Sequence, residues 1–194
     1  MVNRIAFFNK LRTFNLFTRL NRGQIDGMNA IIDEWISNTA YTDIRWLSYM
    51  LATVYHETGR TMQAIEEYGK GKTRPYGKKI KHSGKTYTTP NKLYYGRGLV
   101  QLTWYENYEL MGRLLGYDLL NKPEMALDSS ISIKIMFEGM TKGSSSIGDF
   151  TGKCLEMYFN SKVNDPLGAR RIINGIDKAA LIKLYHEKFL KCLL

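Results

Sequence analysis

The 194-residue sequence predicts a mostly α-helical, α+β fold in a single domain, and three observations support this prediction. Apolar residues recur at three- and four-residue steps in several separate segments, which is the spacing of amphipathic helices. Hydrophobic residues make up 44% of the chain, enough for one packed core. Residues 68–91 instead combine four glycines, two prolines and many lysines without helical periodicity, and they predict a small β-hairpin region.

The helices can be placed from their apolar spacing and from the residues that begin and end them. In chain order they are residues 4–20, Gln24–Ile36, a segment that begins after Thr42 or Asp43 and stops at Gly59, Tyr105–Leu115 before Gly116, Ser129–Met140, and Ala179–Leu194. The first could pack on the core or lie on a membrane surface, and its two asparagines favour packing. The last should place Lys183, His186, Lys188 and Lys191 on its polar side.

A β-hairpin and a short linker are predicted between the helices. Lys79–Lys81 and Lys85–Thr89 are candidate strands on either side of a turn at Ser83 and Gly84. Gly143–Gly148 is a Ser/Gly linker that is too short to separate domains.

The chain is basic, with 28 Lys and Arg against 18 Asp and Glu and a formal charge of +10. Such a surface attracts polyanions, so nucleic acid, anionic lipid and acidic cell-wall polymers are all compatible with it. A soluble lysine-rich surface without a specific partner is an equal alternative. Because no nucleic-acid-binding motif accompanies the charge, we expect no nucleic-acid partner.

The residues that bind metals are too few and too scattered to form a site. Cys154 and Cys192 are expected to be reduced thiols in the core. His56, His82 and His186 show no HExxH or similar spacing, so we expect no metal and no other cofactor.

The N-terminal sequence favours synthesis in the cytoplasm. No segment approaches 18 uncharged apolar residues, the length of an ordinary membrane-spanning helix. Lys10 and Arg12 interrupt the short apolar run that would otherwise suggest a signal peptide.

The stretch Leu51–Tyr68 contains three carboxylates near a predicted helix end. Glu57 follows Val54 by three residues, so it shares the apolar face of that helix. Partial burial disfavours the ionised form of a carboxyl group, which suits a general acid, although local capping or pairing is the commoner role of an isolated glutamate. Glu66 and Glu67 follow about ten residues later.

A second informative stretch, LYYGRGLVQLTWYEN, covers residues 93–107. Two glycines flank Arg97, and the polar residues Gln101 and Thr103 then lead into the adjacent aromatic residues Trp104 and Tyr105. Polar groups beside aromatic rings are what the recognition of sugar rings requires, but the same pattern also describes an ordinary turn.

Three motifs in this order resemble the family 19 glycoside hydrolases: HETG at 56–59, YYGRGLVQLTW at 94–104 with Asn107-Tyr108, and IINGID at 172–177. That family contains the class I chitinases and related phage and bacterial endolysins. The resemblance spans roughly residues 6–190 and looks closest to the compact endolysins. It implies a lysozyme-like fold with the β-hairpin region beside the catalytic cleft. We therefore expect residues 1–194 to be one catalytic domain without a separate cell-wall-binding domain.

The resemblance also implies residue roles. Glu57 would be the general acid of an inverting glycosidase, and a second carboxylate would be the base that activates water. The endolysin form of the motif puts this base on Glu67, whereas other members of the family would align it with Glu66. Thr103 would help to hold the water. The implied substrate-binding residues are His56, Tyr95, Gln101, Trp104, Asn107 and Asn174, of which Tyr95 supports the cleft wall.

The lysine-rich loop and the presence of only two cysteines depart from the plant chitinases and favour peptidoglycan over chitin. The expected partners are peptidoglycan glycan strands and anionic cell-wall or outer-membrane polymers, with the protein a monomer. Lacking a signal peptide, it would reach the wall or periplasm through a separate membrane pore (a holin). A chitinase, and a non-catalytic wall-binding or phage structural module, are the alternatives.

Overall fold

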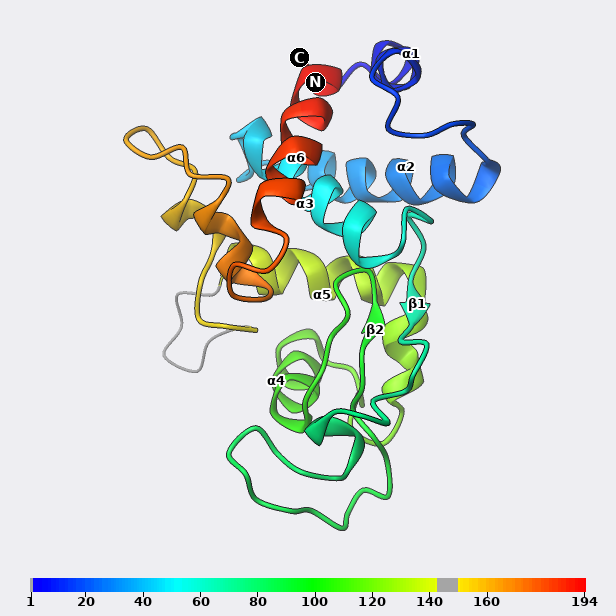
Figure 1. The fold of residues 1–194 in the computed structure, drawn as a ribbon, viewed down its shortest axis with the longest axis vertical. Coiled ribbons are helices and arrows are strands. Elements are labelled where there is room, and N and C mark those ends of the chain that lie inside the picture. Colours follow the sequence, from blue (N-terminus) through cyan, green and yellow to red (C-terminus); the bar gives the residue numbers. More distant parts are fainter. Residues whose placement is uncertain (1, 143–149) are drawn as a thin grey trace.

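The computed structural model describes residues 2–142 and 150–194, and it consists mainly of α-helices (Figure 1). The α-helices are α1 (Arg4–Thr13), α2 (Arg22–Ser37), α3 (Ile44–Glu57), α4 (Tyr105–Leu115), α5 (Ser129–Thr141) and α6 (Ala179–Leu193). Short 3₁₀ helices are η1 (Pro75–Gly77), η2 (Pro123–Leu127), η3 (Leu155–Met157) and η4 (Gly168–Ile172). The predicted mostly helical class is confirmed. The linker expected at Gly143–Gly148 lies outside the described residues.

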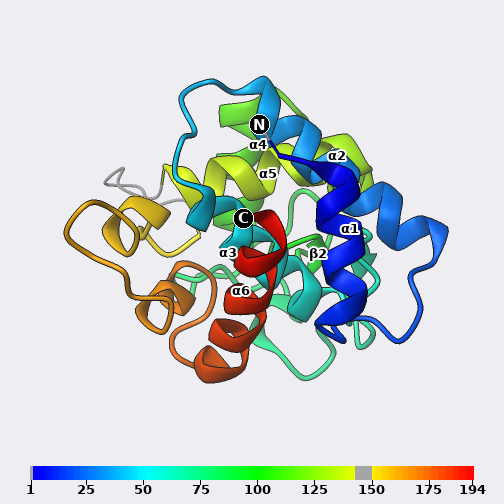
Figure 2. The same ribbon diagram turned by 90° about the horizontal axis from the view of Figure 1, so that it is seen from above.

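Helix α3 is the centre of the core, because every residue from 47 to 55 is buried. It packs against α6, and α1 lies beside α6 on the outer side (Figure 2). Of the two predicted caps, Thr42 and Asp43, it is the side chain of Asp43 that caps its first turn, by accepting the N–H of Arg45. At the other end Gly59 adopts φ +56°, which ends the helix and turns the chain away.

The small sheet has two strands, β1 (Ile65–Glu66) and β2 (Arg97–Gly98), which pair antiparallel with Glu66 opposite Arg97. Residues 67–96 connect them as a long loop in the lower part of Figure 1, near α4. The segments predicted as strands at Lys79–Lys81 and Lys85–Thr89 pair around the predicted turn, but too briefly to count as strands. The N–H of Lys81 donates to the oxygen of Lys85 at 2.8 Å and the N–H of Tyr87 to that of Lys79 at 3.1 Å, which leaves a single antiparallel bridge between Ile80 and Thr86.

The first helix is shorter than predicted, since α1 ends at Thr13 and not near residue 20. Asn15 adopts φ +51°, and the chain changes direction there. This bend lets Leu16 and Phe17 enter the core, where the ring of Phe17 meets the ring of Tyr55 edge to face at 5.0 Å. Phe7 and Leu11 are also buried in the core, so the apolar face of this helix is not available to lie on a membrane surface.

His186 was predicted on the polar side of the last helix, and that placement is wrong. Its side chain is buried between the rings of Tyr49 and Phe159, with centroid distances of 5.6 and 5.2 Å. Burial, aided by the positive charge of Arg45 and opposed by Asp43, lowers the pKa of His186 to about 4. The imidazole is therefore neutral at neutral pH.

Both cysteines are buried free thiols, as predicted. Burial raises the pKa of Cys192 to about 11, so its thiol is not activated. No helix within the described ranges is long and apolar enough to cross a membrane.

Acid should destabilise the fold through His186. Between about pH 7.5 and about pH 5 the unfolded chain binds a proton at this residue and the native chain does not, so the free energy of unfolding should fall by about 2 kcal/mol. Urea unfolding of the wild type and of His186→Phe at both pH values measures this. The variant keeps an aromatic ring, and its stability should vary less over this window. Equal losses in both proteins would contradict the assignment.

Candidate functional site

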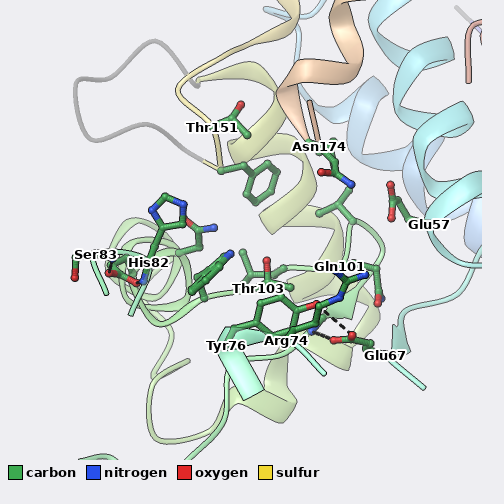
Figure 3. Close-up of a pocket in the computed structure, with 18 residues that line it drawn as sticks. Glu57, Glu67, Arg74, Tyr76, His82, Ser83, Gln101, Thr103, Thr151 and Asn174 are labelled. Atoms are coloured by element: carbon green, nitrogen blue, oxygen red, sulfur yellow. Dashed lines mark hydrogen bonds between the residues drawn. The ribbon is translucent and has the colours of Figure 1, made fainter. Parts of the chain in front are cut away.

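A cleft of about 750 Å³ lies between the end of α3 and the segment around the two-stranded sheet. Figure 3 shows Glu57 and Asn174 on one side of it and Glu67, Tyr76 and Arg74 on the other. The lining residues are Glu57, Glu67, Arg74, Tyr76, His82, Ser83, Gly96, Val100, Gln101, Leu102, Thr103, Trp104, Glu106, Asn107, Phe150, Thr151, Ile173 and Asn174. They come from separate stretches of the chain between residues 57 and 174.

Glu57 enters the cleft as the last residue of α3, and its side chain is only 15% exposed. Its Oε1 accepts a hydrogen bond of 2.6 Å from Nη1 of Arg170. Arg170 is buried in η4, and its Nε donates to the backbone oxygen of Asp177 at 2.9 Å. The carboxylate therefore has a fixed orientation and a fixed positive partner.

Glu67 follows β1 and faces the same cleft. Its Oε1 accepts the hydroxyl of Tyr76 at 3.2 Å, and its Oε2 accepts the N–H of Gly96 at 3.0 Å. Burial and the adjacent carboxylate raise the pKa of Tyr76, so the phenol stays protonated and can donate. Two donors, one in η1 and one just before β2, thus hold the carboxylate of Glu67.

Glu66 does not line the cleft, because successive side chains of an extended strand point in opposite directions. It accepts the hydroxyl of Tyr95, and its second oxygen lies 3.0 Å from Nζ of Lys70. Arg97 is 3.5 Å away and stacks over the ring of Tyr95 at 3.7 Å. The hydrogen bond from Tyr95, followed by that from Lys70, holds the pKa of Glu66 below its ordinary value.

The other residues implied by the resemblance fall into two groups. Gln101, Thr103, Trp104, Asn107 and Asn174 line the cleft. His56 and Tyr95 do not line it: His56 is half-buried, with its pKa lowered mainly by burial, and Tyr95 is buried against Arg97.

The segment Leu99–Trp104 forms one tight turn. Gln101 and Trp104 adopt φ +54° and +73°, a strained conformation for residues other than glycine. The side-chain amide of Gln101 donates to the backbone oxygens of Ile65 and Gly98, both at 3.1 Å. This turn therefore positions the cleft floor relative to both strands.

Several lining residues were missed in the sequence, namely Arg74, Tyr76, His82, Ser83, Glu106, Phe150, Thr151 and Ile173. Half of them belong to the lysine-rich stretch of residues 68–91, whose charge suggested a role without indicating which side chains face the cleft. The partner of Glu57, Arg170, was also missed. It follows the acid by 113 residues, and nothing local in the sequence connects the two.

The arrangement brings two carboxylates to opposite sides of one cleft, with amide and hydroxyl groups between them. Such a pair can protonate one atom of a bound substrate while activating water on the other side. Among the described residues there is no group of three His, Cys, Asp or Glu that could hold a metal ion.

The sequence of residues 38–147 matches the family described as chitinase class I. Endochitinase 1 of Theobroma cacao is 53% identical over 49 residues, which is 25% of this chain and 15% of that protein. Inactive chitinase-like protein 1 of Hevea brasiliensis is 54% identical over 46 residues, 23% of this chain and 15% of that protein. The chain thus matches only a small part of these relatives.

The fold resembles solved structures over nearly its whole length. Chitinase C from Streptomyces griseus superposes with a TM-score of 0.64 at 20% identity, covering 99% of this chain and 76% of that one. At this identity the likeness shows the shared fold alone, and it confirms the predicted lysozyme-like class.

Arg170 and Glu57 should contribute to the free energy of unfolding as a coupled pair. We expect Arg170→Ala to lower the free energy of unfolding by about 3 kcal/mol, because it leaves a largely buried carboxylate without its cation. Combining it with Glu57→Gln should recover part of the loss, as measured by urea unfolding of all four proteins.

Arg171→Ala is the matched control, since this neighbouring arginine is exposed and should change stability by less than about 0.5 kcal/mol. Simple addition of the losses from Arg170→Ala and Glu57→Gln would show that the pair does not act as a unit.

Proposed function

The chain belongs to glycoside hydrolase family 19, the class I chitinases, and we propose that it hydrolyses β-1,4 bonds between N-acetylated amino sugars of peptidoglycan. The observation that carries the proposal is the placement of Glu57 and Glu67 on opposite sides of one cleft. Cleavage of a glycosidic bond needs a proton on the leaving oxygen and a nucleophile at the sugar carbon, and two opposed carboxyl groups can supply both.

In this proposal Glu57 is the general acid. Its protonated form gives a proton to the glycosidic oxygen as the bond to the sugar carbon breaks. The carboxylate that remains is stabilised by Arg170, whose guanidinium is already 2.6 Å from Oε1. Because Arg170 is itself held by a backbone oxygen, the acid keeps its position during the reaction.

Glu67 is the proposed general base. It accepts a proton from a water molecule that attacks the sugar carbon from the face opposite the leaving group, so the product has inverted configuration. Inverting glycosidases keep their carboxyl groups about 6.5–9.5 Å apart to admit this water. The hydroxyl of Thr103 lines the same cleft and can orient the water through a hydrogen bond.

Peptidoglycan is favoured over chitin because the cleft is bordered by a strongly basic loop, and peptidoglycan carries acidic groups that chitin lacks. We further propose an endolysin-type role for this domain, in which it reaches the wall from inside the cell through a separate membrane pore. Active enzyme in the medium of intact producing cells would contradict release through such a pore.

Two alternatives are supported by particular comparisons. Cleavage of chitin is favoured by the names of the relatives, several of which are endochitinases. A non-catalytic wall-binding module is suggested by the relative from Hevea brasiliensis, which is named as inactive. Release of reducing ends from purified peptidoglycan and from soluble chitin oligosaccharides separates all three, because the binding module would release none.

Loss of either cleft carboxylate should nearly abolish activity. We expect Glu57→Gln and Glu67→Gln each to reduce the rate of reducing-end release from purified peptidoglycan by about 10²–10⁴-fold. Proton NMR of the first product formed should show the inverted anomer. Near wild-type rates in either variant would remove that residue from the mechanism.

Glu66→Gln is the matched control for Glu67→Gln. Because Glu66 points away from the cleft toward Tyr95 and Lys70, its loss should lower the thermal midpoint and reduce turnover by less than about tenfold. A larger loss from Glu66→Gln than from Glu67→Gln would reverse the two roles. Separately, mass spectrometry of the reducing ends that the wild type releases would identify which glycosidic bond is cut.

A further inference from the structure

The positive charge of the protein is concentrated in one segment. Residues 69–92, called the basic loop below, contain eight Lys and Arg and no Asp or Glu. The rest of the chain holds 20 Lys and Arg against 18 Asp and Glu, so it is nearly neutral. A charge confined to one loop suggests a local function for that loop, since general solubility would be served by charges spread over the surface.

The basic loop is anchored to the cleft by specific contacts. The carboxylate of Glu106, in the first turn of α4, accepts the N–H groups of His82 and Ser83 at 3.0 and 3.2 Å. The rings of Tyr76 and His82 meet Trp104 edge to face at 5.4 and 5.0 Å. These contacts hold one part of the loop as a wall of the cleft.

Arg74 is placed on this wall by a tightly closed turn. The backbone of Gly77 lies so close to Gly71 that an added Cβ would be 2.0 Å from the oxygen of Gly71. The N–H of Arg74 donates to that same oxygen at 2.8 Å, and Pro75 restricts Arg74 to its extended conformation. The guanidinium therefore starts from a fixed backbone position.

Arg74 is also a free cation. Within the described ranges, Lys70 is the residue of the basic loop that pairs with a carboxylate, Glu66 at 3.0 Å, whereas Arg74 has no carboxylate oxygen within 4.0 Å. Its side chain lines the cleft on the same side as Glu67 (Figure 3). Glu67 would repel an acidic substrate, and the nearby guanidinium offsets that repulsion.

The position of this cation limits what its ligand can be. Arg74 lines the cleft that the glycan would occupy, so an anionic group carried by the bound glycan can reach its guanidinium. A guanidinium binds a carboxylate through two parallel hydrogen bonds. Lysines of the basic loop that lie outside the cleft, such as Lys85, can contribute only long-range attraction, which salt screens within about 8 Å at physiological ionic strength.

We propose that Arg74 binds a carboxylate substituent on the sugar chain and thereby selects acidic N-acetylated glycans over neutral ones. This inference rests on the proposed function, because it places the glycan in the cleft between Glu57 and Glu67. It makes Arg74 a specificity-determining residue that contacts the substrate beside the reacting bond.

Kinetics on one substrate in two charge states tests the proposal. The substrate is peptidoglycan glycan from which the stem peptides and the phosphate polymers have been removed, with the carboxylates of its sugars either free or amidated. On the free form, Arg74→Gln should raise KM about tenfold or more with a smaller change in kcat, the loss expected for one charged hydrogen-bonded pair. On the amidated form the wild type and the variant should have the same KM.

The matched control is Lys85→Gln, which removes the same charge from an exposed position outside the cleft and should change KM by less than about twofold. Arg74→Lys should recover only part of the loss, since an ammonium cannot form the paired hydrogen bonds. The proposal is overturned if Arg74→Gln weakens both substrate forms equally or if Lys85→Gln has an equal effect. It is also overturned if the effect requires the phosphate polymers.

A binding measurement keeps this test separate from the proposed function. If the wild type releases no reducing ends from any glycan, the proposed function fails. Calorimetric titration of the wild type and Arg74→Gln with the same two glycans then still decides whether Arg74 recognises the carboxylate. Because Arg74 is exposed, the variant should fold normally, which its thermal midpoint would confirm.

Discussion

The ion pair between Glu57 and Arg170 is the contact on which the cleft depends. Helix α3 is almost wholly buried, so its last residue brings a carboxylate to a site with little access to water. An ionised group in such a position needs a partner, and the partner is 113 residues later in the chain. The C-terminal part of the protein must therefore pack onto α3, and contacts of α6 with α3 and η4 accomplish this. The ion pair, the core and one wall of the cleft form together.

The opposite wall depends on the alternation of side chains along a short strand. Glu66 turns toward Tyr95 and Arg97 and helps to fix the sheet, while Glu67 turns into the cleft and is held by Tyr76 and the backbone of Gly96. Neighbouring carboxylates thus serve different purposes because their surroundings differ. The two walls also differ in charge. The part of the chain outside residues 69–92 is nearly neutral and carries Glu57, whereas the basic loop borders the side of Glu67.

Much of the architecture could be predicted from local patterns. The bounds of α4, its termination at Gly116 and the start of α5 were predicted to the residue, and the cap of α3 was narrowed to Thr42 or Asp43, of which the structure has Asp43. These features depend on helical spacing and on capping groups within a few residues, so a short stretch of sequence is enough to predict them. The segments predicted as strands at Lys79–Lys81 and Lys85–Thr89 meet in a single bridge only, because a two-stranded hairpin is marginal without a third strand beside it, and such a neighbour is not a local property.

The sequence by itself determined the helical class, the family motifs and the set of three carboxylates from which an acid and a base can be chosen. Only the tertiary structure decided which of Glu66 and Glu67 faces the cleft, that His186 is buried, and that Arg170 and Tyr76 hold the two cleft carboxylates. The physical reason is distance along the chain. The burial and the partners of a side chain depend on segments that come close to it only in the folded protein. The periodicity within one segment therefore does not predict them.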